Sequence, residues 1–464
     1  MKTNASKRPL RLLILCLLLT CVADTRADSP PNIVFIMADD LGYGDVGCYG
    51  ATLVKTPNID GLANSGIRFT DAHTPASSCT PTRYGLLTGN YPKTGVVPPH
   101  SPLIVPTNQM TLASMLKKAG YRTGCIGKWH LGFGGKGGPD WNGEIKPGPL
   151  EVGFDYYFGV PVSNNWAPFV YVENRHVYGR KAHEVIKVAK RGPRGYEREL
   201  SSIANKRKHE EIAVVQTARA VKFIESNDGK PFFLYFAPCN VHHPHTPGRK
   251  HVGKSKAGIY GDFVEELDWS LGQVLDALGK LKILDNTIVV FTSDNGPEMR
   301  DQWYYKGPRV TKHASNGILR GQKGSEYEGG HRVPFIANWP GKIKASTTSD
   351  ALICLTDMLA TFAAVVDVQL PKSTGKDSFN ILPELLAAHN GPPIRQSLKH
   401  FRGAFRMNEW KLYRKELYNL RTDVRERNNV YEQHPEIVKK ITALKQQQKQ
   451  AGRSAPLRKH ADSP

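Results

Sequence analysis

The chain has 464 residues, 40% of them hydrophobic and 23% charged, which is enough for more than one globular domain. Its 63 lysines and arginines exceed its 42 aspartates and glutamates, giving a formal net charge of +21. This excess favours polyanionic partners: nucleic acid, anionic membranes, or sulfated and carboxylated polymers. The chain carries neither a zinc-finger pattern nor an RNA-binding motif with interleaved aromatic residues, so the prediction is a partner other than nucleic acid.

The N-terminal 27 residues have the pattern of a signal peptide. A basic head is followed by an apolar stretch at residues 12–19 and by a small-x-small cleavage sequence, Thr25-Arg26-Ala27. The apolar stretch is too short to span a bilayer comfortably and no later stretch does better, so we predict no transmembrane segment. The mature protein is therefore expected to be secreted or periplasmic. Five cysteines remain after cleavage, and their odd number and wide spacing do not indicate a disulfide framework.

The first predicted strand ends in two adjacent carboxylates. Residues 32–38 form a continuous apolar run, typical of a buried strand in a parallel sheet, and Asp39 and Asp40 follow directly. Open α/β sheets bind ligands at the carboxyl ends of their strands, and adjacent carboxylates repel each other unless a cation is present. We interpret the pair as a candidate metal site; the alternative is a solvated acidic loop.

A predicted helix that begins at Cys79 combines a nucleophile with an anion clamp. Pro81 lies in its first turn, where a missing N–H costs nothing, and Gly89 ends it. The N-terminus of a helix offers unpaired N–H groups to an anion, and Arg83 adds a fixed fork of donors on the face that carries Cys79. From the residues alone, a buried structural cysteine beside a surface arginine is equally compatible with the pattern.

Helices and strands alternate along the following chain, and polar residues again follow the strands. The predicted helices cover residues 57–66, 111–118, 209–227 and 261–280, and the predicted strands cover residues 122–126, 231–237 and 287–293. This alternation predicts an α/β fold with a large, mostly parallel sheet flanked by helices. The strand at 122–126 leads to Lys128 and His130. The strand at 287–293 ends in Asp294 and Asn295, hard oxygen ligands that suit Ca²⁺ or Mg²⁺. Three histidines after residue 237 are discounted as a zinc site, because Pro244 and the tight spacing leave no regular face for them.

Two later regions complete the predicted organisation. A stretch rich in lysine and arginine at residues 180–208 is either a solvated face or lines the approach of a polyanion. After a linker at residues 370–375, short antiparallel strands and a helix from about Pro435 predict a smaller C-terminal antiparallel-sheet-plus-helix domain. The predicted division is a signal peptide at 1–27, a catalytic domain at 28–370 and a C-terminal domain with a basic tail at 371–464.

Five ordered blocks resemble the formylglycine-dependent sulfatases of the arylsulfatase and N-acetylgalactosamine-6-sulfatase type, in the alkaline phosphatase-like superfamily. The first is Cys79-Thr80-Pro81-Thr82-Arg83 followed by Leu86-Leu87-Thr88-Gly89, in which the family usually has serine in place of Thr82. The second is Gly127-Lys128-Trp129-His130-Leu131-Gly132, and the others contain Ser163, His242 and Lys323. The resemblance covers residues 32–430 and implies the alkaline phosphatase-like fold.

The resemblance also implies the chemistry. In this family the cysteine at the position of Cys79 is oxidised by a maturase to formylglycine, whose hydrate attacks sulfur with one hydroxyl and uses the other to expel sulfate. The implied metal is Ca²⁺, with the ligands Asp39, Asp40, Asp294, Asn295 and residue 79. The implied catalytic residues are Cys79, Arg83, Lys128, His130, His242 and Lys323, and Ser163 contacts the sulfate. His242 or Lys323 would protonate the leaving alcohol and His130 would act as base, although the assignment of acid and base stays open.

The predicted activity is therefore hydrolysis of a sulfate monoester. A sulfated carbohydrate is the expected substrate, because export places the enzyme near polysaccharides and a strongly cationic chain attracts a polymer with many sulfates. The alternatives are a phosphomonoester or phosphonate hydrolase on the same scaffold, and an inactive polyanion-binding protein.

Overall fold

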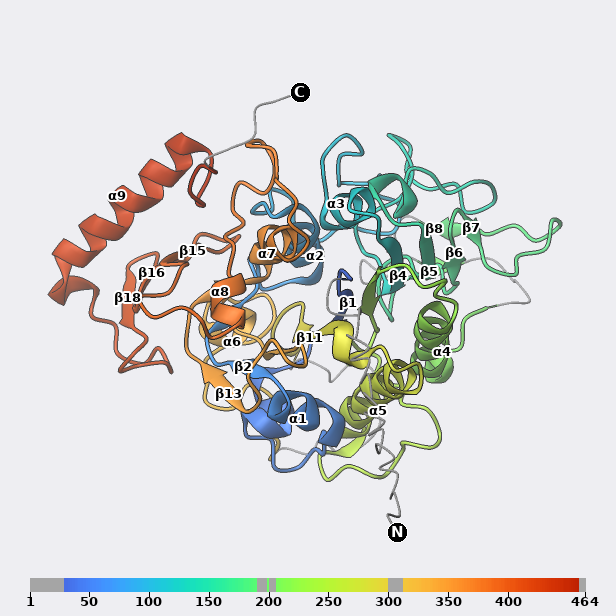
Figure 1. The fold of residues 1–464 in the computed structure, drawn as a ribbon, viewed down its shortest axis with the longest axis horizontal. Coiled ribbons are helices and arrows are strands. Elements are labelled where there is room, and N and C mark those ends of the chain that lie inside the picture. The colour runs from blue at the N-terminus through green and yellow to red at the C-terminus, as the bar shows by residue number, and fades with distance from the viewer. Residues whose placement is uncertain (1–28, 190–197, 200–205, 299–311, 459–464) are drawn as a thin grey trace, which may run out of the picture. The chain divides into compact units, whose positions relative to one another are not determined.

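A mostly parallel sheet forms the centre of the fold in the computed structural model (Figure 1). In the residues that the structure describes, 29–189, 198–199, 206–298 and 312–458, this sheet has ten strands in the order β13-β2-β12-β11-β1-β10-β4-β5-β6-β7. The strands are β1 (Asn32–Ala38), β2 (Ile67–Phe69), β4 (Arg122–Lys128), β5 (Tyr156–Val160), β6 (Val172–Glu173), β7 (His176–Val177), β10 (Phe232–Ala237), β11 (Thr287–Ser293), β12 (Phe335–Asn338) and β13 (Thr347–Ser349).

The central strands β11, β1, β10, β4 and β5 are parallel neighbours. β1 is buried along its whole length, and its side chains alternate between the two faces of the sheet. Phe35 and Met37 pack into the core on one face, whereas Val34 and Ile36 pack into the core on the other. The continuous apolar run of β1 thus reflects burial on both faces, as predicted.

Helices cover both faces of the sheet. Figure 1 shows α2 (Cys79–Thr88), α3 (Leu112–Lys118) and α7 (Met358–Val365). These helices contribute Leu86, Leu116 and Phe362 to the core that contains Phe35. α1 (Pro57–Asn64), α4 (Ile212–Glu225) and α5 (Gly258–Lys280) pack on the opposite face. Two shorter helices are α6 (Glu328–His331) and α8 (Leu382–Leu385). The predicted helices and strands are confirmed to within a few residues, except that β4 extends to Lys128 and the helix predicted from residue 209 begins with a 3₁₀ turn, His209–Glu211.

A smaller antiparallel sheet follows, as predicted. Its strands are β15 (Ser397–Lys399), β16 (Phe405–Met407), β17 (Trp410–Tyr413) and β18 (Glu416–Asn419), and α9 (Pro435–Ala451) packs on it through Ile441. The buried Lys411 of β17 lies 3.0 Å from Glu328 of α6 and 2.8 Å from Glu426, so an ion-pair network joins this sheet to the central part of the chain. Two-stranded pairs elsewhere are β3 (Ala72–His73) with β14 (Ile353–Cys354), and β8 (Val188–Ala189) with β9 (Arg198–Glu199).

Some predictions concern residues outside the described part of the chain. The signal peptide at 1–27 and much of the basic stretch at 180–208 fall there, and the division at residue 370 stays a prediction. None of the described helices combines the length and the apolarity that a bilayer crossing needs. The five cysteines at 48, 79, 125, 239 and 354 are free thiols.

Candidate active site

The predicted metal ligands meet at the carboxyl edge of the central sheet. Asp39 and Asp40 directly follow β1, and Asp294 and Asn295 directly follow β11. Because β1 and β11 are parallel neighbours in matched register, the residues that follow them emerge side by side. α2 begins at this edge with Cys79, so the N-terminal end of a helix faces Asp39 and Asp40.

Lysines hold two of the carboxylates. Lys128, the last residue of β4, places its Nζ atom 2.8 Å from both carboxylate oxygens of Asp39. Lys323 places its Nζ atom 2.6 Å from Oδ2 of Asp40. Burial raises the pKa of Asp39 to about 7, although Lys128 opposes the shift. Burial acts on the pKa of Asp40 in the same direction, but Lys323 and Lys128 outweigh it and the net shift is downward. Asp39 therefore binds a proton more tightly than its neighbour Asp40.

Arg83 is fixed by the groups around it. Its side chain is 0% exposed, and its Nε and Nη2 atoms donate to Oδ2 of Asp294 at 3.1 and 2.6 Å. Its Nη1 atom donates to the carbonyl of Lys128 at 2.9 Å and to the Tyr235 hydroxyl at 3.3 Å. These hydrogen bonds fix the orientation of the guanidinium. Because arginine stays protonated, Arg83 contributes a permanent positive charge next to Asp294 and Asp39.

Cys79 lies against the adjacent carboxylates Asp39 and Asp40. Its Sγ atom is 3.7 Å from Oδ1 of Asp39 and 3.9 Å from Oδ1 of Asp40, and the residue is 2% exposed. Burial raises the pKa of the thiol to about 12, although Lys128 and Lys323 oppose the shift. An unmodified Cys79 is therefore a protonated thiol at neutral pH, which is a weak nucleophile.

Two histidines each present one ring nitrogen with a lone pair. Nε2 of His130 donates to the carbonyl of Val97 at 3.1 Å, and its buried Nδ1 has no hydrogen-bond partner. Nδ1 of His242 donates to the carbonyl of His243 at 2.6 Å, which leaves Nε2 as the lone pair, 3.6 Å from Oδ2 of Asp40. Burial lowers the pKa of both residues well below the ordinary histidine value, and the nearby lysines add to this shift. Both rings are thus neutral and oriented for proton transfer.

These residues fit a divalent cation. Ligand atoms of Asp39, Asp40, Cys79 and His242 all lie within 4.8 Å of one another. Oδ1 of Asn295 is buried without a hydrogen-bond partner, while its Nδ2 atom donates to Asp40 at 2.8 Å. A buried amide oxygen without a donor costs free energy, and coordination to a cation would remove that cost. Asp40 also adopts a left-handed backbone conformation, φ 63°, which is uncommon outside glycine and clusters at functional sites.

Ser163 is hydrogen-bonded to a neighbouring loop residue and not to the carboxylates of this cluster. Its hydroxyl donates to Oδ1 of Asn165 at 2.8 Å, and Nδ2 of Asn165 donates to Nε2 of His243 at 2.8 Å. The sequence reasoning missed Asn165 and Tyr235. The run Asn164-Asn165 resembles any polar loop, and Tyr235 is hidden in an apolar strand, so neither gave a usable signal.

Lys323 marks the side from which the site can be reached. Its side chain is 15% exposed, whereas those of Lys128 and Arg83 are 0% exposed. His242 lies on the same side, with a 5% exposed side chain in contact with Asp40. Lys323 and His242 are therefore more exposed than Cys79, which is 2% exposed.

A buried nucleophile position, paired carboxylates at a sheet edge and basic side chains around them define a hydrolase of anionic esters. Residues 31–368 match the family model described as Sulfatase, and the chain belongs to the sulfatase family. It is a sulfuric ester hydrolase, and the predicted fold class is confirmed by the match to sulfatase structures.

Three relatives illustrate the similarity. An N-acetylgalactosamine-6-O-sulfatase from Bacteroides thetaiotaomicron is 39% identical, across 89% of this chain and 92% of the relative. Human arylsulfatase A is 36% identical, across 82% of this chain and 72% of the relative. A solved structure described under the metabolism of multiple glycosaminoglycans by Bacteroides thetaiotaomicron has a TM-score of 0.84 and 37% identity, and the match covers 90% of this chain and 99% of that one.

Proposed function

We propose that this sulfatase releases sulfate from a sulfated carbohydrate, with Cys79 converted to formylglycine and Ca²⁺ in the carboxylate site. The observation that carries the proposal is the position of Cys79, buried at the N-terminus of α2 with its sulfur 3.7 Å from Asp39 and 3.9 Å from Asp40. A thiol whose pKa is raised to about 12 has little use as a nucleophile there. The hydrate of formylglycine would instead supply a hydroxyl for attack on sulfur and a second one for release of sulfate.

Ca²⁺ would be held by Asp39, Asp40, Asp294, the Oδ1 atom of Asn295 and the modified residue 79. Once Cys79 carries oxygen in place of sulfur, the set consists of hard oxygen ligands in an adaptable arrangement, which Ca²⁺ prefers. The ion would supply positive charge beside the sulfate group. The three carboxylates are already balanced by three basic side chains, so the dication would leave a net charge of +2 for an anionic substrate.

The positions of the remaining residues suggest which of them bind the sulfate and which transfer protons. Lys128 and Lys323 lie where ammonium groups can bind the sulfate oxygens, and Arg83 supplies a fixed charge behind them. Lys323 and His242 are the candidates to protonate the leaving alcohol. Lys323 already carries its proton, because Asp40 holds the pKa of its ammonium group above the ordinary value, whereas the neutral His242 ring would first have to take up a proton at Nε2. The lone pair on Nδ1 of His130 makes it the candidate base. We assign Ser163 to the sulfate-contacting wall.

The substrate class rests on charge and on one relative. The chain carries a net charge of +21, which draws a polymer with many sulfates more strongly than a singly charged ester. A relative with 39% identity is an N-acetylgalactosamine-6-O-sulfatase. We therefore propose a 6-O-sulfated amino sugar within a polyanionic glycan as the substrate. The enzyme would meet such a polymer after export to the periplasm or the medium, and a maturase would convert Cys79 beforehand.

Mass spectrometry of the peptide that contains Cys79 tests the conversion directly. Cys79→Ala and Cys79→Ser should fold and lose turnover, and full turnover by either variant would refute the role of formylglycine.

A matched pair of substrates, an aryl sulfate and an aryl phosphate, tests which ester the enzyme hydrolyses, and we expect the sulfate to be preferred. Elemental analysis should find calcium, lost together with activity in Asp294→Ala; stoichiometric zinc without calcium would contradict the metal assignment.

A further inference from the structure

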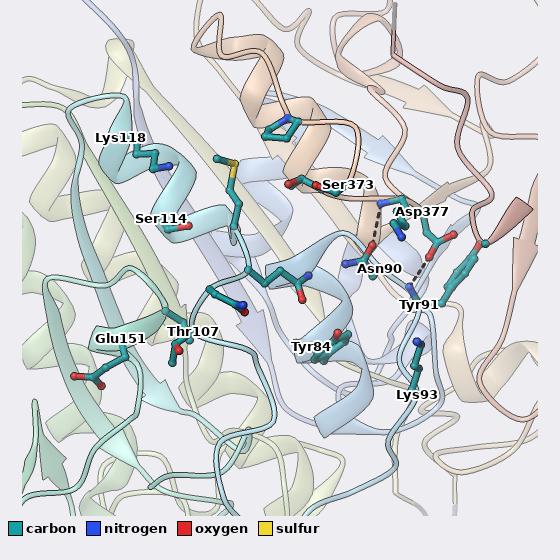
Figure 2. Close-up of a pocket in the computed structure, with 18 residues that line it drawn as sticks. Tyr84, Asn90, Tyr91, Lys93, Thr107, Ser114, Lys118, Glu151, Ser373 and Asp377 are labelled. Atoms are coloured by element: carbon teal, nitrogen blue, oxygen red, sulfur yellow. Dashed lines mark hydrogen bonds between the residues drawn. The ribbon is translucent and has the colours of Figure 1, made fainter. Parts of the chain in front are cut away.

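A groove with a volume of about 700 Å³ lies at the C-terminal end of α2 (Figure 2). Most of its lining comes from three parts of the chain: the end of α2 with the loop after it, the region from Thr107 to α3, and the segment at 371–377. Glu151, Val152 and Gly452 complete the lining. Tyr84, the first lining residue on α2, lies five residues after Cys79, so the groove begins about 7.5 Å from Cys79 along the helix axis and extends past the end of the helix. The catalytic arrangement does not use this groove.

The groove carries positive charge that the protein does not neutralise. Lys93, Lys118 and Lys376 are exposed residues of its lining, and none of them has an ion-pair partner in the part of the chain that the structure describes. Figure 2 shows Lys93 and Lys118 at opposite ends of the lining. Separated ammonium groups of this kind fit an extended anion better than a single compact one.

The two acidic residues of the lining are engaged within the protein. Glu151 lies 2.7 Å from Nη2 of Arg175 and accepts a hydrogen bond from the Gly148 amide at 2.6 Å. Asp377 accepts from the backbone N–H of Tyr91 at 2.8 Å, which Figure 2 shows as a dashed line, and from Ser454 at 2.9 Å. The carboxylates therefore support the walls, while the lysines face solvent.

The rest of the lining suits a carbohydrate. Half-buried Tyr84 offers a ring face and a hydroxyl, and Thr107, Asn108 and Ser373 offer hydroxyl and amide groups that are exposed. The walls are tied together where the backbone N–H of Lys376 donates to the Asn90 side chain at 2.9 Å. A preformed polar groove with few apolar residues matches a hydroxyl-rich, anionic chain rather than an apolar ligand.

One segment joins the groove to the candidate active site. Residues 93–110 begin in the groove at Lys93, run past the catalytic edge and return to the groove at Thr107. Along this path the carbonyl of Val97 accepts from His130 at 3.1 Å, and the backbone N–H of Ile104 donates to Leu131 at 3.0 Å. A ligand in the groove thus lies next to the segment that orients a predicted catalytic histidine.

We propose that this groove binds a second segment of the sulfated carbohydrate whose ester is cleaved at Cys79. The inference rests on the proposed function. The lysines would contact sulfates or carboxylates of neighbouring sugar units, so a long oligosaccharide would bind more tightly than a short one with the same cleavable sulfate.

The test uses the full chain and size-defined chondroitin 6-sulfate oligosaccharides. Binding is measured with the Cys79→Ala protein, which holds the ligand uncleaved, with and without alanine at Lys93, Lys118 and Lys376. The matched control places alanine at three exposed lysines elsewhere: Lys222, Lys280 and Lys344. At 0.15 M salt the groove variant should bind the long oligosaccharide about tenfold more weakly, since each exposed charge pair is worth roughly a twofold change. Its affinity for the disaccharide and its kcat/KM for an aryl sulfate, measured with Cys79 present, should change less than about twofold.

Several outcomes would overturn the inference. Unchanged affinity for the long oligosaccharide means that the groove does not hold it, and an equal loss in the control variant means that only the overall charge matters. Equal competition by a single-stranded oligonucleotide of the same charge would show that the groove takes any polyanion. Failure of the wild-type enzyme to release sulfate from any of these esters would instead overturn the proposed function, and the inference with it.

Discussion

Arg83→Met should destabilise the protein, and most strongly when calcium is chelated. The guanidinium lies 2.6 Å from Asp294 and 3.9 Å from Asp39, all three side chains being 0% exposed. With an effective dielectric constant of about 20, these contacts are worth about 6 and 4 kcal/mol. Desolvation of the guanidinium offsets part of this gain, so we expect a loss of about 3–5 kcal/mol in the free energy of unfolding.

Calcium should reduce that loss. The proposed site brings the ion to the carboxylates that Arg83 neutralises, so with calcium bound the variant leaves less charge uncompensated. We expect the loss to fall to about 2 kcal/mol at saturating calcium, because the ion supplies an alternative positive charge. The assay is urea unfolding of wild type and variant, each in chelator and in calcium, with calcium affinity measured separately.

Arg395→Met is the matched control. Arg395 is also 0% exposed, and its Nη2 and Nε atoms lie 2.5 and 2.9 Å from the carboxylate oxygens of Asp357, away from the candidate metal ligands. Its removal should cost a similar 3–5 kcal/mol in chelator and in calcium alike. An Arg83→Met loss that does not depend on calcium, or that is below about 1 kcal/mol, would refute the reasoning.

Three further predictions concern stability. Burial raises the pKa of Glu266 from 4.5 to about 7 in the folded state. As the pH rises from 4.5 to 7, the unfolded chain releases the Glu266 proton before the folded protein does. Stability should therefore fall by up to about 3 kcal/mol between pH 4.5 and 7. Glu266→Gln should flatten that slope in urea titrations, and an unchanged slope would contradict the assignment. Lys411→Met leaves Glu328 and Glu426 buried together and should cost about 3–5 kcal/mol, seen as a lower urea midpoint; a loss under about 1 kcal/mol would show that the ion pairs do not hold the C-terminal sheet. Gly127→Ala should lower the free energy of unfolding by more than about 3 kcal/mol, since φ is 109° and a Cβ atom would lie 2.0 Å from the carbonyl oxygen of Ala237. A melting temperature close to that of the wild type would contradict this prediction.

The sequence predicted the central fold because buried parallel strands are long apolar runs. The runs that became β1, β10 and β11 are of this kind, and their ends brought Asp39 and Asp294 to one edge without any knowledge of pairing. The apolar pattern does not show where β4 ends, because Gly127 and Lys128 break the apolar run. The predicted strand therefore stopped two residues before Lys128, the last residue of β4.

Contacts between distant residues could not be predicted. The Tyr235 hydroxyl, on β10, accepts a hydrogen bond from Arg83 of α2, 152 residues away in the sequence. In the sequence, Tyr235 looks like any other aromatic residue in an apolar run. Asn165 accepts a hydrogen bond from Ser163 and pairs with His243, 78 residues further on, and this pairing depends on how two loops meet. The link from Lys411 to Glu328 spans 83 residues. Such polar contacts are set by tertiary packing, on which local propensity and motif spacing carry no information.

The burial of the helix that begins at Cys79 has a consequence for biosynthesis. The five residues from Cys79 to Arg83 are all buried, and the first of them is 2% exposed. A modifying enzyme that must grip this peptide in its own cleft cannot do so once α2 has docked on the sheet. The proposed conversion therefore has to take place before α2 is buried, and a chain that folds first would keep an unmodified Cys79. The converted fraction of a preparation is then set by relative rates, so slowing the folding of the nascent chain should raise specific activity without changing the final structure.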